Sequence, residues 1–182
     1  AQVYAADQEV NQTRFEIEEE CFTLIVTQQP AARDLRAIVT AMNVIVDLER
    51  MGDQAKGIAK VIPHLLKNPA QTRPDELLAM AEEVADMLQQ VMVAYGNSNV
   101  DLARVVAQQD DKVDLLYNRV FTQIMNQMAA TGNTDKVEAA YELLRVAREL
   151  ERFGDLATNI AERTIYLVTG TFDEVNVDHD ED

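Results

Sequence analysis

A six-residue motif occurs twice in this chain, in residues 48–53 and again in residues 150–155. Both copies read Leu-Glu-Arg-x-Gly-Asp, and the match continues at a constant offset of 102 residues. Eight of the fifteen pairs between 47–61 and 149–163 are identical. Self-similarity at a fixed spacing indicates a structural unit that is duplicated within one polypeptide. We therefore expect two related units, each with the motif in the same local setting.

The sequence around the motifs is typical of helices. Only four prolines and six glycines interrupt the 182 residues, and 47% of the residues are hydrophobic, which is enough to bury a core. Apolar residues recur every three or four positions along five segments. This pattern predicts an all-α protein, with helices at about 2–28, 31–66, 75–95, 100–130 and 135–169.

A polar segment that contains two prolines divides the chain into two repeats. We expect a first repeat at 1–68, a linker at 69–74, a second repeat at 75–170 and an acidic, disordered tail at 171–182. The second repeat has three predicted helices and the first has two, and the sequence begins at Ala1 without an initiator Met. Because two helices cannot enclose a core as three can, we expect the first repeat to lack an N-terminal helix. Missing sequence, a second copy or another chain would complete it.

The charge balance limits the class of partner. Acidic residues outnumber basic ones by 32 to 16, and the formal net charge is −16. Such a field repels nucleic acid and anionic lipid, and it favours cations or a basic protein surface. The single cysteine, Cys21, excludes an internal disulfide and is expected to be a buried structural side chain. Without a secretory leader or an apolar run of about 18 residues, the sequence predicts a soluble, cytosolic protein.

Each motif places two carboxylates four residues apart, on one face of its helix. Like charges at this spacing cost a few tenths of a kcal/mol. The preceding helix of the second repeat carries a further acidic pair at the same spacing, and its counterpart in the first repeat keeps one acid. Clustered carboxylate oxygens are best stabilised by a bound cation. The candidate ligands from these rows are Glu49, Asp53, Glu151, Asp155, Asp110, Asp114 and Asp7.

Two other residues of the motif bear on this site. Gly52 and Gly154 each cost about 1 kcal/mol inside a helix relative to Ala, which indicates close approach of a neighbouring helix or a ligand. The arginine of each motif offers a second interpretation, in which the acids form an ordinary salt-bridged, solvated surface. The residues alone leave both interpretations open.

The available ligand types restrict which metal such a site could hold. His64 and His179 are expected to be exposed, so a structural Cys/His zinc site is excluded. The Glu-x-x-His pattern of di-iron oxidases is also missing. Oxygen ligands leave Fe, Mn, Mg or Ca as candidates. With no phosphate-binding Gly loop or nucleophile elbow, and with Ser98 in a turn as the only serine, a binding or regulatory module is favoured over an enzyme.

Three features together resemble the PhoU family of phosphate-uptake regulators. They are the doubled motif, the Gln29-Pro30 entry to the first motif helix with residues 34–36, and the Asp-Asp-Lys-Val-Asp run at 110–114. The resemblance extends to about Gly170. It implies tandem three-helix bundles and identifies the missing helix as the first helix of the family. It also implies an adaptor that acts with a phosphate ABC transporter ATPase and a sensor histidine kinase to repress the phosphate-starvation response. We expect this adaptor to be a homodimer.

The resemblance further implies multinuclear iron or zinc, or other divalent cations, on the acidic rows, with Asn159 as an additional ligand of the second row. Asn11 replaces an acid in the first repeat, and Gly57 stands where the second repeat has Asn159. We therefore expect the first site to have fewer ligands and the second to be the better candidate. Two alternatives remain open: an accessory domain of another phosphate carrier or of a longer protein, and a carboxylate-bridged metalloenzyme.

Overall fold

The computed structural model describes residues 2–67 and 72–171 and contains five α-helices. The predicted helices are confirmed, with ends that differ by at most one residue. The predicted tail lies almost wholly outside the described residues, as does part of the predicted linker. The helices are α1 (Gln2–Gln28), α2 (Ala32–Leu65), α3 (Asp75–Gly96), α4 (Val100–Ala130) and α5 (Thr134–Thr169).

Local side-chain chemistry explains where several helices begin and end. The side chains of Asn99 and Asn133 accept hydrogen bonds, both of 3.1 Å, from backbone N–H groups in the first turns of α4 and α5. Gly170 ends α5 in the left-handed conformation, with φ of 78°, which glycine adopts without steric cost. Pro30 lies just before the first turn of α2 and not within it, because the intervening Ala31 is extended.

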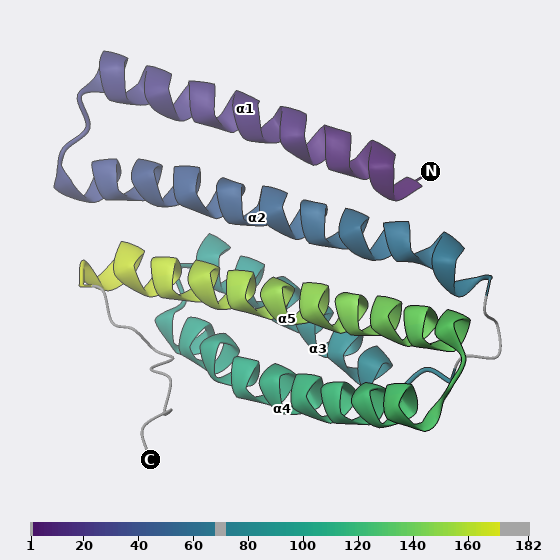
Figure 1. The fold of residues 1–182 in the computed structure, drawn as a ribbon. Helices are drawn as coiled ribbons and strands as arrows, with labels where there is room; N and C mark the ends of the chain where they lie inside the picture. Colours follow the sequence, from purple (N-terminus) through teal and green to yellow (C-terminus); the bar gives the residue numbers. More distant parts are fainter. Residues whose placement is uncertain (1, 68–71, 172–182) are drawn as a thin grey trace.

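The helices form a layer in the order α1, α2, α5, α4, and α3 lies behind α4 and α5 (Figure 1). We call α1 and α2 the first repeat and α3 to α5 the second repeat. In the second repeat each helix packs against the other two. Within the described residues, the backbone of α1 approaches that of α2 alone, and the backbones of α2 and α3 stay apart although both helices neighbour α5.

This arrangement places most of the hydrophobic core in the second repeat, and α2 adds Val44, Met51 and Val61 to it. Cys21 is the one buried residue of α1, whereas the inward faces of α3, α4 and α5 are almost fully buried. Phe15 and Phe22 on α1 remain 55% and 65% exposed, because α1 has a single neighbour. No helix of the described part combines the length and the apolar character needed to cross a membrane.

The two motif helices, α2 and α5, join the repeats. Asp47 on α2 is only 1% exposed and accepts a 2.8 Å hydrogen bond from Nε of Arg163 on α5. Arg50 lies 3.8 Å from the same carboxylate. A buried carboxylate needs such partners, because its water shell is lost on folding. The pair therefore ties the position of one repeat to that of the other.

Candidate functional site

The two motif glycines mark where the acidic helices of each repeat meet. A Cβ atom added to Gly154 would lie 2.9 Å from Oδ1 of Asp110, closer than real side chains pack. A Cβ atom on Gly52 would lie 3.9 Å from Oδ1 of Asp7, which is ordinary contact. The expected close approach is thus confirmed at Gly154 and is looser at Gly52. The two repeats also pair equivalent residues, since Asp7 faces Gly52 as Asp110 faces Gly154.

In the second repeat, the predicted ligands lie along the α4–α5 seam. Asp110 is buried, Glu151 and Asn159 are half-buried, and Asp114 and Asp155 are exposed. Burial raises the pKa of the Glu151 carboxyl, and the negative charges of Asp155 and Asp114 raise it further. The structure therefore brings Asp155 and Asp114 near enough to Glu151 to repel it, as the sequence predicted, while the guanidinium groups of Arg152 and Arg148 lower the pKa of Glu151 in part.

Thr158 is a polar residue of this seam that the sequence analysis did not select. It is 6% exposed, and its Oγ1 has no hydrogen-bond partner among the residues that the structure describes. Its position, three residues after Asp155 and seven after Glu151, puts it on the same side of α5 as these carboxylates. An unpartnered buried hydroxyl calls for an explanation, such as an ion or water that it contacts.

In the first repeat, the equivalent carboxylates are neutralised by cationic side chains of the protein. The Nζ atom of Lys56 lies 2.9 and 2.7 Å from the two carboxylate oxygens of Asp7, and 2.7 Å from Oδ1 of Asp53. The hydrogen bonds to Asp53 and Asp7 raise the pKa of Lys56 above its usual range. Arg14 lies 3.4 Å from Oε2 of Glu49, while Asn11 is exposed. The salt-bridge interpretation thus describes the first repeat well.

The repeat contains a sequence signal for the different role of Lys56. Lys56 and Thr158 stand at the same offset of 102 residues as the motif copies, so one repeat carries a cation where the other carries a hydroxyl. Among the described side chains, no three from His, Cys, Asp and Glu gather closely enough to hold a metal ion by themselves. His64 is exposed as expected, and His179 lies outside the described residues.

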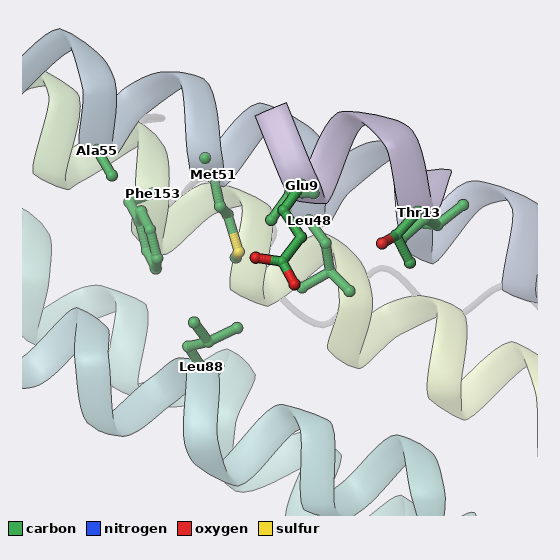
Figure 2. A pocket seen from close by; sticks show the side chains of 10 residues that line it. Glu9, Thr13, Leu48, Met51, Ala55, Leu88 and Phe153 are labelled. Carbon is green, nitrogen blue, oxygen red and sulfur yellow. The ribbon is translucent and has the colours of Figure 1, made fainter. Parts of the chain in front are cut away.

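A second feature is an apolar groove between the first repeat and the bundle of the second. It has a volume of about 550 Å³, and side chains of α1, α2, α3 and α5 line it. Figure 2 shows Met51, Leu88 and Phe153 directed into the same space from three helices. A separate pocket of about 260 Å³ lies nearer the C-terminal end of α2, between Ile62 and Leu78. Both hollows lie between α2 and α3.

Comparison with known proteins gives consistent matches. The PhoU domain model matches residues 1–62 and 77–164. The chain is 39% identical to a "phosphate-specific transport system accessory protein PhoU homolog" of Clostridium acetobutylicum, over 93% of this chain and 77% of the relative. It is 35% identical to the protein of that description from Pseudomonas aeruginosa, over 93% of this chain and 70% of the relative.

Solved structures show the same fold. The phosphate transport system regulatory protein PhoU from Streptococcus pneumoniae superposes with a TM-score of 0.85 and 31% identity, over 94% of this chain and 79% of that one. PhoU from Pseudomonas aeruginosa gives a TM-score of 0.87 and 34% identity, over 93% and 81%. The resemblance seen in the sequence and the all-α, PhoU-like fold are therefore confirmed.

Proposed function

The chain belongs to the PhoU family, and on this premise we propose that it is a cytoplasmic regulator of phosphate uptake that acts as an adaptor and not as an enzyme. The observation that carries the proposal is the match of the family model to both repeats, 1–62 and 77–164. It is supported by relatives described as accessory proteins of phosphate-specific transport. The family consists of accessory and regulatory proteins, and this chain offers no nucleophile and base at the spacing that hydrolytic motifs require.

The proposed partners are the ATPase of a phosphate ABC transporter and a sensor histidine kinase. Through them the protein represses the phosphate-starvation response when phosphate is plentiful. A net charge of −16 suits contact with basic surfaces on such partners. We propose that the protein does this as a homodimer.

Affinity capture from cells grown in high and in low phosphate tests this function. The natural polypeptide that contains this sequence should recover the transporter ATPase or the sensor kinase under high phosphate. An ABC ATPase of unrelated substrate serves as the control for nonspecific recovery. If neither partner is recovered, the adaptor role is wrong. The identity of the genes next to the coding sequence then tests the alternative, in which the protein serves another phosphate carrier. A screen for oxidase and phosphatase turnover tests the metalloenzyme alternative.

We propose that a helix equivalent to α3 completes the first repeat. Residues 1–68 together with that helix, and residues 75–170, would then form tandem three-helix bundles joined by a linker at 69–74. Leu48 and Ala55 line the apolar groove and are partly exposed, whereas their counterparts Leu150 and Ala157 are buried in the second repeat. A surface that is core in one copy and open in the other lacks the element that covers it. The chain also spans about three quarters of its relatives' length.

We also propose that the second repeat holds divalent cations, iron and zinc included. Asp110, Asp114, Glu151, Asp155 and Asn159 supply the oxygen ligands that hard cations prefer. The unpartnered Thr158 hydroxyl is consistent with such a group. A bound cation would neutralise the repelling carboxylates and tie α4 to α5. Elemental analysis of protein purified without chelator or affinity metal tests this proposal.

A further inference from the structure

We infer that Lys56 is a tethered cation that fills the cation site of the first repeat, so that exchangeable divalent ions bind in the second repeat alone. The site in the second repeat lies along the α4–α5 seam, beside Thr158. This inference deepens the proposed cation binding and is independent of the proposed role in phosphate regulation. It makes a single residue, Lys56, the determinant of which repeat accepts a metal.

Lys56 and Thr158 occupy equivalent positions in the two repeats. The motif helices correspond at an offset of 102 residues. Packing shows separately that α1 corresponds to α4. Asp7 on α1 lies beside Gly52, and Asp110 on α4 lies beside Gly154. Lys56 follows Gly52 by four residues, as Thr158 follows Gly154. Both residues therefore stand at the same point of the seam between an acidic helix and a motif helix.

The ammonium group of Lys56 lies between α1 and α2. It contacts both oxygens of Asp7 on α1 and one oxygen of Asp53 on α2, at 2.7 to 2.9 Å. It thus bridges the two helices through three carboxylate contacts, as a bound cation would. Its charge compensates these carboxylates, and a metal ion would first have to displace an ammonium that is attached to the chain.

The first repeat also has fewer oxygen ligands for a metal ion than the second. Asn11 stands where the second repeat has Asp114, and Gly57 stands where it has Asn159. A Cβ atom on Gly57 would lie 3.3 Å from Cδ of Glu149 on α5, which is tighter than nearly all real contacts. Packing against the second repeat therefore disfavours any ligand side chain at position 57.

The second repeat differs at each of these points. Thr158 brings an uncharged oxygen in place of the ammonium, and that oxygen is buried and unpartnered within the described structure. Asp114 and Asn159 are both present. Threonine is also uncharged, so at this position of the second repeat an ion has no ammonium group to displace.

Counting bound Mn²⁺ by electron paramagnetic resonance tests the inference, with the 182-residue chain and four variants. Lys56→Thr should bind at least one more ion than the wild type, and the gain should be larger with Asn11→Asp added. Thr158→Lys should lose the sites of the second repeat. Lys60→Thr is the matched control, because Lys60 is exposed on the same helix and its loss changes the net charge equally. It should bind as many ions as the wild type.

Acid-to-amide variants provide a second readout that does not depend on introducing lysine into a buried position. Glu151→Gln with Asp155→Asn should abolish specific Mn²⁺ binding, whereas Glu49→Gln with Asp53→Asn should leave it unchanged. Circular dichroism confirms that each variant is folded. Equal losses in the two pairs would overturn the inference, as would a wild type that binds no Mn²⁺. Partner capture by the natural polypeptide is a separate result, so either outcome leaves the adaptor role to its own test.

Discussion

The guanidinium of Arg163 and the carboxylate of Asp47 form a 2.8 Å hydrogen bond between helices of different repeats. Asp47 is among the most buried charged residues of the described chain. Removing one partner of a buried ion pair costs more than removing both, because the remaining charge is left without compensation. This pair therefore holds the two motif helices in register.

We predict that Arg163→Met lowers the free energy of unfolding by about 3 kcal/mol. The double variant Asp47→Asn with Arg163→Met should lose less, because no buried charge remains. Urea unfolding followed by circular dichroism measures both. Arg104→Met, at an exposed site on α4, is the control. A loss no larger than that of the control would show that the pair contributes nothing to stability.

Alanine at the two motif glycines should have opposite effects. Gly52→Ala should raise stability by up to about 1 kcal/mol, because the helix gains propensity and the new methyl group makes only ordinary contacts. Gly154→Ala should lower it by about 1 kcal/mol, because the methyl group would press on the buried carboxylate of Asp110. Urea unfolding of the two variants checks this. Equal effects would contradict the tighter packing at Gly154.

The thiol of Cys21 should react slowly with a disulfide reagent in the native protein. It is 6% exposed, and burial raises its pKa, so the reactive thiolate is scarce at neutral pH. The rate should increase by at least about tenfold in denaturant, and in the native protein it should keep rising at pH values where an exposed thiol has levelled off. Stopped-flow absorbance measures the rate. A native rate equal to the denatured one would show that α1 does not stay packed on α2.

The apolar groove should bind a neutral hydrophobic dye such as Nile red. Met51→Gln should reduce the fluorescence, because its side chain lines the groove. Leu115→Gln is the control, since Leu115 is 51% exposed on α4 and lies outside the groove. In the natural polypeptide the binding should disappear if a further helix covers the surface. Undiminished fluorescence in Met51→Gln would place the dye elsewhere.

The features that follow from local sequence were predictable. Helix positions depend on apolar spacing and on capping residues such as Asn99, Asn133 and Gly170, all within a few positions of the helix ends. The approach of the acidic rows also follows from the repeat, because the same glycine in both copies indicates a close neighbour.

The roles of other residues depended on partners distant in the sequence. Lys56 reaches Asp7, which is 49 positions away, and Arg163 reaches Asp47 across 116 positions. The apolar residues of α1 did not reveal that Phe15 and Phe22 are exposed. Burial depends on which helices lie beside α1, and a periodic pattern does not identify them.

The sequence by itself determined that this protein is a duplicated all-α chain with carboxylates clustered at each motif, because repeats and helical periodicity are local and countable. Only the tertiary structure decided that the two copies differ in chemistry. An ammonium group neutralises carboxylates of the first repeat, while the equivalent position of the second repeat holds a buried hydroxyl, and this difference depends on which side chains helix packing brings within about 3 Å of each other.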